Sequence, residues 1–125
     1  MAKIRHVAIC AENTGKLAEF YKTTFGMHEL RRLPGPAESV PIFLTDGYIN
    51  LAVLPASQNG GREGIFHFGF QVEDALDASR RAKAAGAATE AEAQPQDGRY
   101  AEFRVWDPVG TPVDLSEHGW ETTRA

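Results

Sequence analysis

Two histidines and one aspartate have the clearest chemical potential in this sequence. The segments IRHVAICAE (residues 4–12) and IFHFGFQVE (residues 65–73) align without a gap and pair His6 with His67. Asp114 follows near the end of the chain, in PVDL. Imidazole nitrogens and a carboxylate oxygen suit zinc, iron, nickel or manganese. Two histidines and one carboxylate on one side of the ion leave its other coordination positions open for water or substrate. The pattern predicts one divalent ion, and the alternative is a metal-free site in which Asp114 hydrogen-bonds one imidazole.

Five further polar or aromatic residues are candidates for substrate contact or catalysis. Asn50 is a weak fourth metal ligand or a hydrogen-bond donor to whatever fills that position. Glu102, Arg104 and Trp106 alternate along one segment, so they share a strand face. The candidate general base is Glu102 or an exchanging Asp114, and the sequence does not choose between them. We expect Arg104 to receive an anionic group bidentately, although an Arg–Glu pair on a solvated face fits equally well. Trp106 and Tyr100 are candidate substrate-binding residues.

Each of the two similar segments leads into a predicted helix. The first helix runs from Thr14 to Phe25, with Asn13 or Thr14 as N-cap and Gly26 at its end. The second follows Asp74 and runs to about residue 85, where Gly86 ends it. The chain is therefore a duplication, because the two halves match in opening strand, cap and stop.

Short strands follow each helix and complete two βαβββ modules, residues 3–56 and 64–118, of one domain spanning residues 1–125. Besides the two opening segments, the predicted strands are 27–33, 40–45, 48–54, 88–93, 100–106 and 112–117. The turns before Asn50 and Asp114 correspond, which predicts equivalent positions for these two residues. The expected fold is α+β, with a cupped, mostly antiparallel eight-stranded sheet and the helices outside.

Alternation decides which side chains face the interior of the cup. His6, Ala8 and Cys10 share one face of the first strand, and the apolar face should pack on the helix. The same parity turns Asp114 away from the helix-packed layer and Glu117 to the opposite side, where solvation is its expected role. We expect Cys10 to be a small buried residue.

Composition narrows the classes of partner. The 125 residues are 42% hydrophobic, with a formal net charge of −4 from interspersed acids and bases, so no nucleic-acid or membrane-directed surface stands out. The N-terminus has no signal-like apolar run, and one cysteine cannot form an internal disulfide. We therefore expect a cytoplasmic protein whose partners are small molecules, metals or other protein chains.

Nearly the whole chain resembles the vicinal oxygen chelate superfamily, which includes glyoxalase I, methylmalonyl-CoA epimerase, extradiol dioxygenases and bleomycin resistance proteins. The resemblance rests on the strand with His6, the helix ending in Phe25-Gly26, the segment FHFGFQV (residues 66–72) and, most specifically, DPVGTPVDL (residues 107–115). It implies metal ligands at His6, His67 and Asp114, and in many relatives a homodimer. Asp114 stands where the superfamily usually has Glu, and Asn50 replaces a ligand of the glyoxalase-like members.

The resemblance predicts a metal-dependent enzyme acting on a small oxygen-chelating substrate, as an isomerase, lyase or dioxygenase. The alternative is a metal-free ligand- or drug-binding protein of the bleomycin-resistance type. Inward-facing aromatic residues such as Trp106 and Tyr100 favour the alternative, whereas His6 and His67 count against it.

Overall fold

The computed structural model describes residues 2–94 and 101–123. Contacts divide the chain into two compact units, which we describe separately. The first unit comprises His6–Phe66 with Glu121–Ala125, and the second comprises Met1–Arg5 with His67–Trp120. The first unit thus extends to Phe66, and each unit takes in a short segment from an end of the chain.

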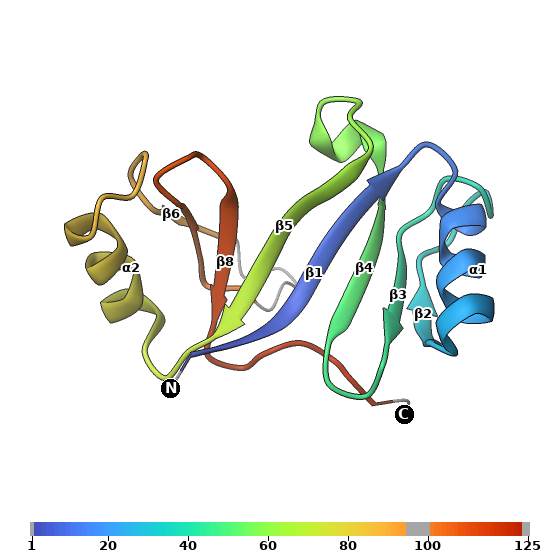
Figure 1. Cartoon of the computed structure of the whole chain (residues 1–125), viewed down its shortest axis with the longest axis horizontal. Helices are drawn as coiled ribbons and strands as arrows, with labels where there is room; N and C mark the ends of the chain where they lie inside the picture. The colour runs from blue at the N-terminus through green and yellow to red at the C-terminus, as the bar shows by residue number, and fades with distance from the viewer. Residues whose placement is uncertain (1, 95–100, 124–125) are drawn as a thin grey trace. The chain divides into compact units, whose positions relative to one another are not determined.

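The first unit carries the strand order β2-β3-β4-β1 with helix α1 (Figure 1). Its strands are β1 (Lys3–Ala11), β2 (His28–Arg32), β3 (Ile42–Thr45) and β4 (Asn50–Pro55), and a 3-10 turn η1 (Ala56–Asn59) follows. β1 pairs in parallel with β4, while β2 with β3 and β3 with β4 are antiparallel. One sheet face packs with α1 in a core that includes Ala18, Ile42, Leu44 and Val53.

Helix α1 (Thr14–Phe25) begins and ends as its sequence predicts. The side chain of Asn13 accepts a hydrogen bond from the Lys16 amide, which satisfies one of the unpaired donors of the first turn. Gly26 ends the helix in the left-handed conformation, with φ 69°, which glycine adopts without steric cost.

The second unit repeats this arrangement with the order β5-β8-β7-β6 and helix α2 (Figure 1). The elements are β5 (Gly64–Gln71), α2 (Ala75–Ala84), β6 (Glu92–Ala93), β7 (Phe103–Trp106) and β8 (Pro112–Ser116). β5 and β8 are parallel, and β7 is antiparallel to both β8 and β6. Asp74 caps α2 by accepting from the Asp77 amide.

These elements confirm the predicted α+β class and the mostly antiparallel strand pairing. The predicted strand 88–93 shrinks to β6, Glu92–Ala93, because its alanines and glutamates have low β-propensity. Tyr100, predicted to open the next strand, lies outside the described residues. Neither helix in the described part of the chain is long and apolar enough to span a membrane.

Candidate functional site

The second unit has one apolar sheet face and one polar face. Val113, Leu115, Val105 and Phe70 pack together in the core beside α2. Because side chains alternate along strands, Asp114 must face the other way, and strand register places it beside Gly69 on one side and Arg104 on the other. The predicted polar face therefore forms here, with Asp114 on its central strand.

Arg104 and Asp114 form a forked ion pair on this face. Arg104 Nε donates to Asp114 Oδ1 at 2.6 Å, and Nη2 donates to Oδ2 at 3.2 Å. The side chains are 18% and 9% exposed, so water screens the pair only weakly. The pairing of Arg104 with Glu102 that its sequence position also allowed is not formed, because the β7–β8 register sets Arg104 directly against Asp114.

His67 lies against both members of this pair. Its Nε2 is 3.3 Å from Asp114 Oδ2, and its Nδ1 is 3.5 Å from Arg104 Nη2. A guanidinium can only donate, so in the second contact Nδ1 accepts and the neutral ring carries its proton on Nε2, toward Asp114. We call His67, Arg104 and Asp114 the polar trio; in this arrangement its donors and acceptors satisfy one another.

His6, the counterpart of His67 in the first unit, has a different partner. Its Nδ1 lies 3.0 Å from Asn50 Oδ1, and Asn50 Nδ2 donates to the Glu121 carbonyl at 2.8 Å. The Glu121 contact identifies the nitrogen of the amide, so Asn50 presents its oxygen to His6 and His6 Nδ1 carries the proton. The neutral ring then bears its lone pair on Nε2, which is the form that binds metals when a neighbouring acceptor orients the ring.

The prediction that Asn50 and Asp114 are equivalent is wrong in strand register. Asn50 lies opposite His6 in the β1–β4 pair, but Asp114 lies opposite Gly69 in the β5–β8 pair, two residues beyond His67. The turns that precede them differ in length, since Asp46-Gly47 is matched by Asp107-Pro108-Val109-Gly110. Asn50 therefore orients an imidazole, whereas Asp114 reaches His67 diagonally.

His67 and Asp114 fit a divalent ion in residue type and in spacing, provided that the imidazole proton moves from Nε2 to Nδ1. Two donors each about 2.1 Å from one ion, at angles of roughly 90° to 110°, lie about 3.0–3.4 Å apart. The observed separation of Nε2 and Oδ2 is 3.3 Å, and both side chains are at least nine-tenths buried. Within residues 2–94 and 101–123, no group of three His, Cys, Asp or Glu side chains is arranged to hold a metal, so this pair is the part of the predicted ligand set that the structure brings together.

Glu102 contacts the backbone of Glu117 and is not part of the polar trio. Glu102 Oε2 accepts from the Glu117 amide at 2.8 Å, and its Oε1 is buried without a hydrogen-bond partner among the described residues, 3.9 Å from His118 Nε2. The Glu117 carboxylate accepts from the Ala75 amide at 2.8 Å and so secures the first turn of α2. Glu117 is exposed, as predicted for a solvated residue, and capping the helix is a structural role in addition.

Cys10 lies on the same face of β1 as His6, in a small cluster with Ala8, Ala52 and Leu54. The side chain is buried, as predicted, and burial raises the pKa of its thiol. A raised pKa lowers the thiolate fraction, so Cys10 is a packing residue rather than a nucleophile.

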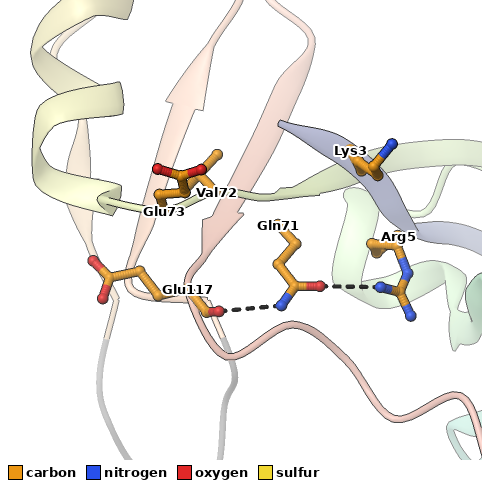
Figure 2. Close-up of a pocket in the computed structure, with 6 residues that line it drawn as sticks. All are labelled: Lys3, Arg5, Gln71, Val72, Glu73 and Glu117. Carbon is orange, nitrogen blue, oxygen red and sulfur yellow. Dashed lines mark hydrogen bonds between the residues drawn. The ribbon is translucent and has the colours of Figure 1, made fainter. Parts of the chain in front are cut away.

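The described surface of the second unit includes two depressions. One, of about 310 Å³, is apolar and lies along α2, where Trp106 lines it with Phe70, Ala82 and Val105. The other, of about 390 Å³, is lined by Lys3, Arg5, Gln71, Val72, Glu73 and Glu117. In Figure 2 the side chain of Gln71 bridges the Arg5 guanidinium, at 3.1 Å, and the Glu117 carbonyl, at 3.2 Å. Neither depression is lined by His67, Arg104 or Asp114.

Solved structures share this fold at low sequence identity. A hypothetical protein from Bacillus halodurans C-125 is 17% identical, with a TM-score of 0.69 over 98% of this chain and 99% of its own. A methylmalonyl-CoA epimerase from Mycobacterium tuberculosis is 18% identical, with a TM-score of 0.65 over 90% of this chain and 85% of its own. A halotolerant catechol dioxygenase is 17% identical, with a TM-score of 0.71 over 98% of this chain but only 41% of its own.

The sequence itself assigns the family. Among curated proteins, none matches the chain. Residues 3–115, however, match the sequence model of the Glyoxalase/Bleomycin resistance protein/Dioxygenase superfamily. This match takes in both opening strands, both helices and the segment that ends in Asp114 and Leu115. The chain therefore belongs to the Glyoxalase/Bleomycin resistance protein/Dioxygenase superfamily.

Proposed function

We propose that this protein is a metal-dependent enzyme that acts on a small substrate with two neighbouring oxygen atoms. The observation that carries the proposal is the separation of 3.3 Å between His67 Nε2 and Asp114 Oδ2 on a buried sheet face. Superfamily membership supports it, because the solved relatives include an epimerase and a dioxygenase. Zinc, iron, nickel and manganese all suit one imidazole and one carboxylate.

Four candidate site residues of the second unit have distinct roles in this proposal. His67 and Asp114 hold the ion, which when bound supplies a positive charge that stabilises an oxyanion developing on the substrate. Arg104 fixes Asp114 from the Oδ1 side, as ligating carboxylates are commonly held by a hydrogen-bonding neighbour. Glu102 is the candidate general base, through its buried Oε1.

His6 stays a predicted metal ligand, and Asn50 is the residue that orients its ring. The support lies within the first unit, where Asn50 leaves the lone pair of the neutral ring on Nε2. A His6→Ala variant tests this role independently of His67. If His6 is a ligand, removing its imidazole must lower the affinity for the metal.

Metal titration of protein purified without an affinity tag tests the proposal. Zinc, manganese and nickel are titrated against a chromophoric chelator, and ferrous iron is titrated without oxygen, for wild type, His67→Ala and a matched His28→Ala control. His28 is exposed on β2, so its loss should leave affinity unchanged. We expect the affinity to fall at least tenfold in His67→Ala. If wild type and His67→Ala bind equally weakly, the protein is not a metal-dependent enzyme.

A bidentate oxygen ligand then tests the substrate class. Acetohydroxamate, which presents two adjacent oxygens, is titrated into metal-loaded and chelator-treated wild-type protein. We expect binding only to the loaded protein, because the ion provides the contact for both oxygens. Equal binding to both forms would instead favour a metal-independent binding site.

A metal-free binding protein of the bleomycin-resistance type is the second candidate. The forked contact between Arg104 and Asp114 favours it, because the guanidinium already neutralises the carboxylate that the ion would need. Trp106, on the apolar depression along α2, is then the residue to probe, by quenching of tryptophan fluorescence with an aromatic cation. Substrate contacts from Asn50, Arg104, Trp106 and Tyr100, a homodimer and a cytoplasmic location stay predictions.

A further inference from the structure

We infer that Arg104 is a built-in competitor of the divalent ion at Asp114, and that it sets how weakly this protein holds its metal. The inference rests on the proposed metal site and concerns a residue outside the ligand set. Its basis is that Arg104 contacts both predicted ligands of the second unit, Asp114 through two nitrogens and His67 through one.

The first effect of Arg104 is on the charge of the carboxylate. Its Nε and Nη2 engage both oxygens of Asp114, at 2.6 Å and 3.2 Å. A divalent ion on Oδ2 would have to replace the longer of these contacts while the guanidinium stays close on Oδ1. A like charge at such a distance, in a place where both side chains are largely buried, opposes the incoming cation.

The second effect is on the protonation of His67. When Arg104 Nη2 donates to Nδ1 across 3.5 Å, the neutral ring keeps its proton on Nε2, the atom that faces Asp114. Metal binding through Nε2 requires the opposite tautomer, with the proton on Nδ1. Arg104 therefore stabilises the form of His67 that cannot bind the ion.

Both effects act in the same direction, so replacing the guanidinium by a neutral group should strengthen metal binding. In Arg104→Gln the positive charge is lost, whereas in Arg104→Lys the charge stays and the fork is lost. We expect Arg104→Gln to bind zinc or manganese at least tenfold more tightly than wild type. Arg104→Lys should stay within about threefold of wild type, since like charges near an ion dominate such shifts.

The test measures metal dissociation constants by chelator competition and, separately, the rise in unfolding temperature that one metal concentration produces. Circular dichroism shows that each variant is folded. Arg81→Gln is the matched control, because Arg81 forms an exposed pair with Asp77 on α2, with side chains 70% and 59% exposed, and its loss changes the net charge equally. Arg104→Gln combined with Asp114→Asn should lose the gain, which shows that the tighter binding uses Asp114.

The outcomes separate this inference from the proposed function. Tighter binding by Arg104→Gln, with a larger metal-induced rise in unfolding temperature, supports the inference, whether or not wild type binds well enough to be a metal enzyme. Wild-type binding that Arg104→Gln leaves unchanged or weakens overturns the inference and leaves the metal site standing. An Arg81→Gln gain equal to that of Arg104→Gln also overturns it, since net charge alone would explain the effect. Absence of binding in every variant overturns both.

Discussion

Removing the guanidinium from the polar trio should cost the second unit much of its stability when no metal is present. Arg104→Met keeps an unbranched aliphatic stem, shorter than that of arginine, and removes the charge and the donors. The carboxylate of Asp114, 9% exposed, would then remain in a largely buried place, where the contact with His67 Nε2 at 3.3 Å is the one left to it among the described residues. Breaking one partner of a buried pair typically costs about 3–5 kcal/mol. We expect about 3 kcal/mol, since Arg104 is itself 18% exposed and His67 can still donate.

A double-mutant cycle tells pairing apart from simple packing loss. Asp114→Asn leaves the guanidinium without its charged partner but keeps one acceptor, so we expect a loss of about 2 kcal/mol. The double variant removes both charges and should lose about 3 kcal/mol, which is about 2 kcal/mol less than the two single losses together. That difference measures the coupling of Arg104 with Asp114.

Urea unfolding at neutral pH with a chelator present is the assay. Both tryptophans of the chain, Trp106 and Trp120, belong to the second unit, so tryptophan fluorescence reports on the unit that carries the pair. Arg81→Met is the control, and its exposed pair should contribute less than about 0.5 kcal/mol. Losses that add to within about 0.5 kcal/mol, or an Arg104→Met loss below about 1 kcal/mol, would refute the argument that the pair is energetically coupled.

Three further predictions follow from the first unit. Cys10, 1% exposed and with a thiol pKa raised by burial, should not react with Ellman's reagent until the chain unfolds; reaction at the unfolded rate under native conditions would contradict its burial. The Arg32 hydrogen bond lowers the pKa of Glu29 to about 2, below its unfolded value of about 4.3, so the stabilisation is complete above that pH and is lost as pH falls toward 2. Glu29→Gln should therefore be less stable than wild type at pH 7, by less than about 1 kcal/mol because water screens the contact, and equal to it near pH 2; a difference independent of pH would rule this out. Asn13→Ala should cost about 1 kcal/mol in urea unfolding by removing the cap on the Lys16 amide, while Asn13→Asp should keep most of it; equal losses in both would mean that the cap contributes nothing.

Local signals in the sequence were enough to predict the elements and the faces of the strands. Asn13, Gly26 and Asp74 mark helix ends through their own side chain or backbone, so the helices were predicted to within a residue or two. Alternation then placed Asp114 and Arg104 on the polar face, because parity along a strand needs no knowledge of distant residues.

Long-range pairing is where the sequence was insufficient. The partner of Arg104 depends on how β7 slides along β8, and a shift of two residues would have joined it to another side chain with the same parity. The diagonal contact between His67 and Asp114 likewise depends on the β5–β8 register. That register could not be predicted by comparison with the first half, because the turns before Asn50 and Asp114 differ in length. The Glu121 carbonyl that fixes the Asn50 amide lies far along the chain, and no spacing rule connects them.

The offset between the two repeats limits how their roles can be exchanged. Asn50 lies opposite its histidine, while Asp114 lies two residues further along, roughly 6.6 Å at the usual rise of a strand. An acid installed by Asn50→Asp would therefore face His6 directly and lose the amide donor to Glu121, instead of recreating the geometry around His67. The duplicated halves have diverged in strand register as well as in residue type. A single substitution therefore cannot convert the surroundings of His6 into those of His67.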